Sequence, residues 1–243
     1  MFYSKALPVW SRRACMRLAV GFAAHFLQAE ELRRIDAPNE EALDPGLVNL
    51  LKRLRGIVAE RKHVALAALM SAGFRVEFDA GKGPVAFRRQ WHPESASNPI
   101  WGILDRLLAM PGHCYMDNLY AVPYVFARFP FDLDPLRHVV AVKDSVDLLA
   151  QPKTDAMRVG SINRSIVPLA EPFEPPVIIP AGGFVELKHP NVGRCFAASA
   201  DIYSPAAHRA FFEKRQGQWR WISLAAATTK DPPELHLHKT ATV

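Results

Sequence analysis

The chain has 243 residues, of which 49% are hydrophobic and 22% are charged. These values are typical of one large or two modest folded domains, and they exclude a disordered or fibrous chain. The formal net charge is +6, but residues 1–29 hold four basic residues and no carboxylate, so about +2 is left for everything after them. A charge that small does not favour nucleic acid as a partner.

The first 29 residues have the pattern of an export signal. Basic residues precede the apolar run LAVGFAAHFL, and Ala29 stands before an acidic segment. The run is about half the length of ~20 residues that a membrane-spanning helix needs, so a cleaved signal peptide at about 1–29 is favoured over an anchor. We therefore expect a periplasmic or secreted protein without a transmembrane segment. An amphipathic N-terminal helix is the alternative, and translation from Met16 would give a more compact signal.

Residues 30–137 are predicted to form the N-terminal part of an α+β domain. Residues 30–45 are polar and interrupted by proline, which is typical of a loose lead-in. Asp44 and Pro45 then provide a side-chain cap and a first-turn proline for a helix whose leucines recur at helical spacing.

Four further elements are expected in the same half, because apolar residues recur at helical or alternating spacing between caps and breakers. They are a helix over 63–72 that stops at Gly73, the strand FRVEFD at 74–79, a helix from Pro84 to Trp91, and a helix that starts at Asn98 and Pro99 and ends at Pro111 and Gly112. Helices that cover a sheet need more strands than this half supplies.

From residue 138 to 203 the pattern changes to short β-branched pieces separated by Gly, Pro, Asn and Asp. Such spacing is typical of a small barrel. Residues 204–228 then contain RAFFEK and WRWISL around the turn RQGQ, which predicts a hairpin with Gly217 at positive φ. We expect this hairpin to complete the sheet of the first half, and residues 229–243 to be a flexible tail.

The terminal hairpin is rich in both aromatic and basic residues. Such strands could bind single-stranded nucleic acid through stacking and phosphate contacts. However, the carboxylate of Glu213 interrupts the run of basic residues. Trp219 and Trp221 lie on one face of a strand, where packing of the sheet accounts for them. The hairpin is therefore interpreted as part of a packed sheet.

The segment from Gly112 to His138 concentrates groups that could form a metal site or an acid–base pair, namely His113, Asp117, Asp132, Asp134 and His138. Their spacing matches no metal-binding motif, and the stretch DLDP is typical of a turn. Its aromatic residues, among them Tyr120 and Tyr124, could line a pocket or pack beneath a sheet. We expect no catalytic residue, metal ion or cofactor.

Two cysteines follow the leader, Cys114 and Cys195. In an oxidising compartment they could form one disulfide, and the alternative is two separate buried thiols. The sequence does not distinguish between these arrangements, because it does not place the two residues relative to each other.

Two stretches, VKDSVDLLAQPKTDAMRVGSINRSIVPLAE and FVELKHPNVGRCFAA, resemble a bacterial SH3-like (SH3b) domain. The residues that fit its motifs are Val146, Leu148, Pro152, Val159, Gly160, Ile162 and Phe196. Two positions depart from the pattern: Cys195 stands where a glycine is usual, and Ala150 stands where an arginine is common. The resemblance covers about a quarter of the chain.

The rest of the chain is similar to exported bacterial proteins known only as SH3-containing. The helix, helix, strand opening and the EKRQGQW hairpin also resemble the cone-shaped NTF2-like fold. Together these resemblances imply a helix-covered antiparallel sheet completed by the C-terminal hairpin, with an SH3-like barrel inserted over 138–203. Resemblance of fold implies no activity.

The SH3b resemblance implies a non-catalytic module that binds a cell-envelope ligand, either peptidoglycan or a partner protein, through exposed aromatic side chains. Phe184, Phe196 and Tyr203 are the expected contacts. The alternative is a small enzyme or ligand-binding protein that uses a cavity of the α+β domain. Its mouth would be formed by Tyr120, Tyr124, Asp132 and His138, and it requires the carboxylate and the histidine to converge.

Overall fold

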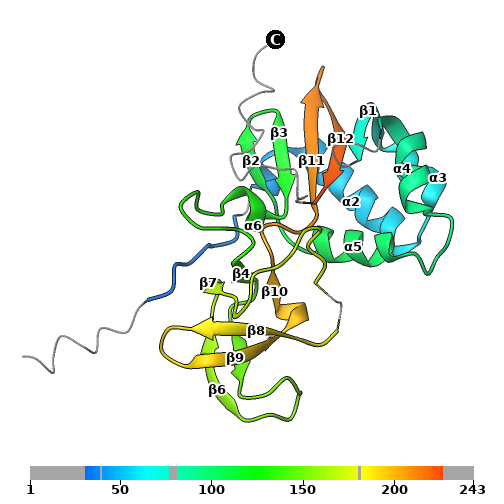
Figure 1. Ribbon diagram of the computed structural model, residues 1–243. Helices are drawn as coiled ribbons and strands as arrows, with labels where there is room; N and C mark the ends of the chain where they lie inside the picture. Colours follow the sequence, from blue (N-terminus) through cyan, green and yellow to red (C-terminus); the bar gives the residue numbers. More distant parts are fainter. Residues whose placement is uncertain (1–30, 39, 77–80, 180–181, 227–243) are drawn as a thin grey trace, which may run out of the picture. The chain divides into compact units, whose positions relative to one another are not determined.

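The computed structural model describes residues 31–38, 40–76, 81–179 and 182–226. The described residues from Leu32 onward belong to one compact unit of mixed α+β structure, which confirms the expected class (Figure 1). No helix in these ranges has the length and apolar character that crossing a membrane requires. The predicted signal peptide at 1–29 and the predicted tail at 229–243 lie outside the described residues.

The elements fall into a helical first half and a β-rich second half. The helical elements are η1 (Glu41–Leu43), α2 (Pro45–Ala59), α3 (His63–Ala68), α4 (Gly83–Trp91), α5 (Pro99–Leu108), α6 (Tyr124–Ala127) and η2 (Ser199–Asp201). The strands are β1 (Met70–Val76), β2 (His113–Met116), β3 (Leu119–Val122), β4 (His138–Ala141), β5 (Val146–Leu149), β6 (Arg158–Ile162), β7 (Ile166–Pro168), β8 (Phe184–His189), β9 (Gly193–Ala198), β10 (Ile202–Tyr203), β11 (Arg209–Arg215) and β12 (Gln218–Ala225).

The two long helices begin where the sequence predicts. The Asp44 side chain accepts hydrogen bonds from the backbone N–H groups of Gly46 and Leu47, at 2.8 and 3.3 Å, and so caps α2. The Asn98 side chain caps α5 in the same way, accepting from the N–H of Ile100 at 2.9 Å. Both helices carry proline in the first turn, where its missing N–H has no consequence.

A five-stranded sheet with the order β1-β12-β11-β3-β2 lies against these helices (Figure 1). Its central pair, β11 and β12, is the terminal hairpin, and β12 pairs in parallel with β1. The turn between them has positive φ at Gln216 and at Gly217, 49° and 78°, which suits the twist of a two-residue hairpin. The hairpin predicted from the sequence therefore completes the sheet that the first half begins.

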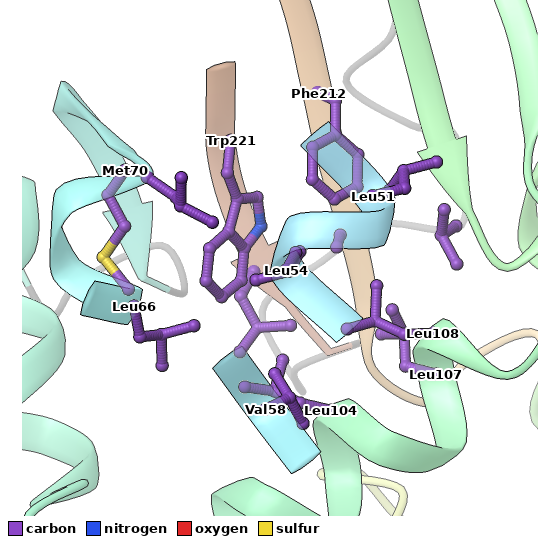
Figure 2. Close-up of a cluster of buried hydrophobic side chains, with 14 of the residues drawn as sticks. Leu51, Leu54, Val58, Leu66, Met70, Leu104, Leu107, Leu108, Phe212 and Trp221 are labelled. Atoms are coloured by element: carbon purple, nitrogen blue, oxygen red, sulfur yellow. The ribbon is translucent and has the colours of Figure 1, made fainter. Parts of the chain in front are cut away.

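One row of paired residues crosses all five strands on the face that the helices cover. It runs Cys114, Tyr120, Phe212, Trp221 and Met70. Residues paired across adjacent strands point to the same face, so this row presents three aromatic rings to the helices. Figure 2 shows Phe212 and Trp221 near leucines of α2 and α5. Leu66 and Met70 lie on the side of Trp221 that faces away from Phe212. These apolar side chains form the main core.

Two predictions about the first half are wrong in detail. The helix expected over 63–72 ends at Ala68, and Gly73 lies inside β1 instead of stopping a helix. The reason is tertiary, because Met70 and Phe74 are buried against the hairpin and an extended backbone places both there. Helical propensity over so short a segment is a weak constraint that packing overrides.

Residues 32–38 of the lead-in have a defined structure, contrary to the expectation of a loose segment. The N–H of Ile35 donates to the carbonyl of Arg164, and the N–H of Ile166 donates to the carbonyl of Arg33, both at 2.8 Å. Ile35 itself is buried among apolar residues. This segment therefore covers the edge of β7, a contact that no pattern in the sequence indicates.

The β-rich half contains a three-stranded sheet, β10-β4-β7, and a four-stranded sheet, β6-β5-β9-β8. Both sheets supply residues to one shared apolar core, which includes Val139, Leu148, Leu187 and Cys195. Within the described ranges, a single isolated bridge between Leu169 and Leu187 connects the two sheets. The strands therefore enclose a common core without closing into a barrel.

Candidate functional site

Tyr120 and Tyr124 do not lie at the mouth of a cavity, in contrast to the alternative hypothesis. Tyr120 is fully buried in the main core, and its hydroxyl accepts a hydrogen bond from the N–H of Gly112 at 2.8 Å. A Cβ on Gly112 would come within 2.2 Å of the carbonyl oxygen of Ala121, so only glycine permits this close approach. Tyr124 is buried in a separate cluster. Burial raises the pKa of both phenols, as expected of core residues.

Asp132 and His138 do not converge on a common point. Both carboxylate oxygens of Asp132 pair with the guanidinium of Arg33, at 2.8 and 2.7 Å, on an exposed surface. The Nδ1 atom of His138 lies 2.9 Å from the backbone carbonyl of Asp134. Each group therefore serves the local structure of its loop, and the acid–base geometry that the alternative hypothesis required is absent from these described residues.

Tyr203 is not the exposed aromatic residue that the sequence suggested. It is 5% exposed, and its hydroxyl donates to the backbone carbonyl of His208 at 2.6 Å. The guanidinium of Arg106 lies over its ring, 5.4 Å from the centroid. Arg106 also donates to the carbonyls of Ser199 and Ile202, so it ties α5 to η2 and β10. Tyr203 is therefore a packing residue where the β-rich half meets α5.

Phe184 and Phe196 remain as surface candidates, on the outer face of the four-stranded sheet. The register pairs Phe196 with Glu186 on one side and with Leu149 on the other, while Phe184 pairs with Ala198. Phe184 and Phe196 are thus diagonal neighbours on one face, and both are half-buried. The opposite face of the same strands carries Leu187 and other core residues.

Charged side chains frame Phe196 on this outer face. The Arg194 guanidinium lies 5.9 Å from the centroid of the Phe196 ring and donates to Glu186 at 2.8 Å. The Arg194 side chain is 73% exposed, and Lys188 beside it is exposed too. The outer face therefore carries a half-buried aromatic ring flanked by charges of both signs.

A cavity of about 290 Å³ lies elsewhere, between α2, η1 and the C-terminal end of α5. Its lining consists of Glu41, Arg55, Val58, Asp105, Leu108, Ala109, Met110 and Pro111. Arg55 makes a two-pronged ion pair with Glu41, at 2.7 and 2.9 Å, and its Nε–H donates to the carbonyl of Leu108 at 3.0 Å. These contacts raise the pKa of Arg55 and fix its guanidinium in the cavity wall.

No pattern in the sequence indicates this cavity. Glu41 lies in the segment expected to be loose, Arg55 lies on the polar face of an amphipathic helix, and Asp105 is one acidic residue among many. A periodic pattern shows which face of a helix is polar, but not which polar residues a fold brings together.

The polar groups at β2 form a small network instead of a metal site. Nδ1 of His113 lies 3.0 Å from a carboxylate oxygen of Glu40, and the N–H of Cys114 donates to the other oxygen at 2.6 Å. Burial raises the pKa of the Cys114 thiol, so it is not an activated nucleophile. Cys114 and Cys195 are free thiols in different cores. Among the residues that the structure describes, no three His, Cys, Asp or Glu side chains gather as metal ligands.

No protein-family model matches the sequence. No curated protein matches it either. Similar solved structures include an NTF2-like protein with a cystatin-like fold from Novosphingobium aromaticivorans, with 11% identity, a TM-score of 0.30, and coverage of 89% of this chain and 91% of that chain. A protein of unknown function with a cystatin-like fold from Nostoc punctiforme has 9% identity, a TM-score of 0.26, and coverage of 83% and 100%. A protein of unknown function from Mycobacterium tuberculosis has 10% identity, a TM-score of 0.25, and coverage of 81% and 78%.

The first of these neighbours is NTF2-like, the first two have a cystatin-like fold, and the last two are proteins of unknown function. All three TM-scores fall well below 0.5, so the likeness establishes neither a shared fold nor a shared function. We therefore infer a function from the residues of this chain alone.

Proposed function

We propose that the chain is a non-catalytic exported protein that binds a cell-envelope ligand, peptidoglycan or an envelope protein, through an SH3-like module over residues 138–203. The order of strands in this segment supports the SH3-like assignment. A hairpin, β8 and β9, leads through the single turn η2 into the short strand β10, and two sheets share one core. The motif residues Val146, Leu148 and Ile162 are all buried in that core.

The observation that carries the binding proposal is the position of Phe196. It sits in the middle of the outer sheet face, between Leu149 and Glu186, with Arg194 over its ring. A partly exposed aromatic ring held on a rigid sheet loses little conformational entropy when it binds. Neighbouring charges of both signs supply hydrogen bonds that orient a polar ligand.

Co-sedimentation with purified peptidoglycan tests this surface, using protein that lacks residues 1–29. We expect Phe184→Ala combined with Phe196→Ala to weaken binding at least about tenfold, because aromatic anchors dominate such interfaces. Phe131→Ala is the matched control, since Phe131 is fully exposed in the loop before β4 and is not part of this face. A native melting temperature for each variant shows that folding is preserved.

The outcomes distinguish peptidoglycan from an envelope protein as the ligand, and they show whether the face around Phe184 and Phe196 is the binding surface. If peptidoglycan does not bind, cross-linking in the native cell should capture an envelope protein with the parent chain and not with the double variant. Equal binding by the parent and the double variant would show that the ligand uses another surface. Failure of both assays would refute the proposed function.

Export is tested separately by the N-terminal sequence of protein recovered from its native cell. A chain that begins near Glu30 would support removal of residues 1–29 as a signal. A chain that retains them would contradict the proposed compartment.

A further inference from the structure

The side chains that line the cavity beside Arg55 and Glu41 have a net negative charge. Among the described residues that line it, Arg55 is the only basic one, and both carboxylate oxygens of Glu41 already pair with it. Asp105 also lines the cavity; its side chain is exposed, and it has no ion pair with another described residue. One carboxylate is thus available to a ligand, whereas the guanidinium is engaged.

The backbone adds to this balance. Leu108 and Ala109 belong to the C-terminal end of α5, a helix of ten residues whose last carbonyls carry a partial negative charge. Arg55 offsets part of this charge, because its Nε–H donates to the Leu108 carbonyl at 3.0 Å, whereas the basic residue of the last turn, Arg106, does not. Its guanidinium points instead to the carbonyls of Ser199 and Ile202.

The rest of the lining is apolar. Val58, Leu108 and Met110 are at least nine-tenths buried, and Pro111 closes the same wall. A volume of about 290 Å³ is at the small end of the range for ligand sites, which suits a molecule of a few carbon atoms. The lining therefore matches a ligand with one cationic head and a short apolar body.

We propose that this cavity binds a small organic cation, a primary ammonium group on a short alkyl or aryl body, with Asp105 as the counter-ion. The ammonium group donates hydrogen bonds to the Asp105 carboxylate, and the body lies on Val58, Leu108 and Met110. An anionic ligand is disfavoured because it would have to displace Glu41 from Arg55 while facing Asp105. This site is independent of the envelope-binding surface.

Titration with n-butylammonium at pH 7, followed by NMR or calorimetry of the full chain, tests the proposal. n-Butanol and butyrate are the comparison probes, because they carry the same alkyl body with a neutral or an anionic head. We expect butylammonium to bind most tightly and butyrate least tightly. Asp105→Asn should weaken butylammonium about tenfold, the usual effect of losing a hydrogen bond to a charged group. Asp155→Asn removes a carboxylate that is 79% exposed on a distant loop and should have no effect.

A second variant tests the role assigned to Arg55. Glu41→Gln removes the partner carboxylate, and we expect the guanidinium then to accept butyrate better than the parent chain does. The proposal is refuted if butanol binds as tightly as butylammonium, if Asp105→Asn leaves the affinity unchanged, or if butylammonium causes no change at roughly tens of millimolar, above which binding is too weak to be specific. A native melting temperature for each variant separates loss of binding from loss of fold.

Discussion

The ring of Trp221 lies 4.9 Å from the ring of Phe74, centroid to centroid, with the two planes inclined at 74°. Phe74 belongs to β1, which follows the early helices, and Trp221 belongs to β12 near the end of the described chain. The two strands pair in parallel, so segments far apart in the sequence form one edge of the sheet. The early helices therefore depend on the terminal hairpin for much of the apolar surface that they bury.

Truncation tests this dependence. We expect a chain that ends at Ser204 to lose cooperative unfolding of its helices, because α2 and α5 would then face water where Phe212 and Trp221 now pack. The measurement is thermal unfolding followed by far-UV circular dichroism. A truncated chain that retains a sharp helical transition would show that the first half folds without the hairpin.

Single substitutions on β12 test the same contact locally. Trp221→Ala should lower the free energy of unfolding by about 3–5 kcal/mol, the usual cost of removing a fully buried large aromatic side chain. Arg220→Ala is the matched control, because Arg220 is the preceding residue and is exposed on the opposite face. Its effect should stay within about 0.5 kcal/mol. Denaturant unfolding measures both values, and equal effects would contradict the assignment of the two faces.

The sequence predicted the parts of the fold that depend on local signals. Asp44 with Pro45, and Asn98 with Pro99, mark helix starts because a side-chain acceptor and a first-turn proline act within a few residues. Gly217 marks the hairpin for a similar reason. The strand at Met70 was missed, because its extended form is stabilised by pairing with a distant segment.

The candidate site was less predictable than the fold. Phe184 and Phe196 were singled out by resemblance, and both lie on a half-exposed face. Tyr203 carried the same expectation, yet it is buried because Arg106 and the His208 carbonyl engage it. Alternation along a strand does not show which face solvent reaches when a helix from another part of the chain covers one of them.

Asp44 should contribute to stability through two separate interactions. Its carboxylate caps α2 and pairs with Lys214 at 2.7 Å, and these contacts lower its pKa to about 2. We expect Asp44→Ala to lower the free energy of unfolding by about 1–2 kcal/mol at pH 7. Asp36→Ala, which removes an exposed pair with Arg34, should have a much smaller effect.

The pH dependence of the Asp44 effect follows from the direction of its pKa shift. The folded chain holds this pKa below the ordinary value of 3.8, so the stabilisation is complete above that value and declines as the pH falls toward 2. Measurements of unfolding from pH 7 to acid should show the parent and Asp44→Ala converging in this window. If the difference in unfolding free energy between the two chains stays the same at acid pH, the ionised carboxylate of Asp44 is not its source.

His208 should make the fold sensitive to mild acid. It is 6% exposed and lies against the Trp91 ring, and burial together with nearby Arg209 lowers its pKa from 6.5 to about 4. The unfolded chain therefore binds a proton first as the pH falls, and stability declines between pH 6.5 and 4. The full contribution is about 3 kcal/mol.

His208→Gln tests this pH dependence, and His92→Asn is its control. The first removes the titrating group and should flatten the pH dependence of unfolding between pH 6.5 and 4. The second changes an exposed histidine at positive φ, a conformation that asparagine adopts readily, and should leave the dependence unchanged. A parent chain whose stability is flat across this range would show that His208 is not the source.

The surface assigned to ligand binding can be located directly by amide chemical-shift mapping of the mature chain with a soluble peptidoglycan fragment. The account predicts shifts that cluster on β8 and β9 around Phe184, Glu186, Arg194 and Phe196, and that disappear in the Phe184→Ala, Phe196→Ala double variant. Shifts confined to other elements, or unchanged by the double substitution, would contradict the assignment of this outer sheet face as the binding surface.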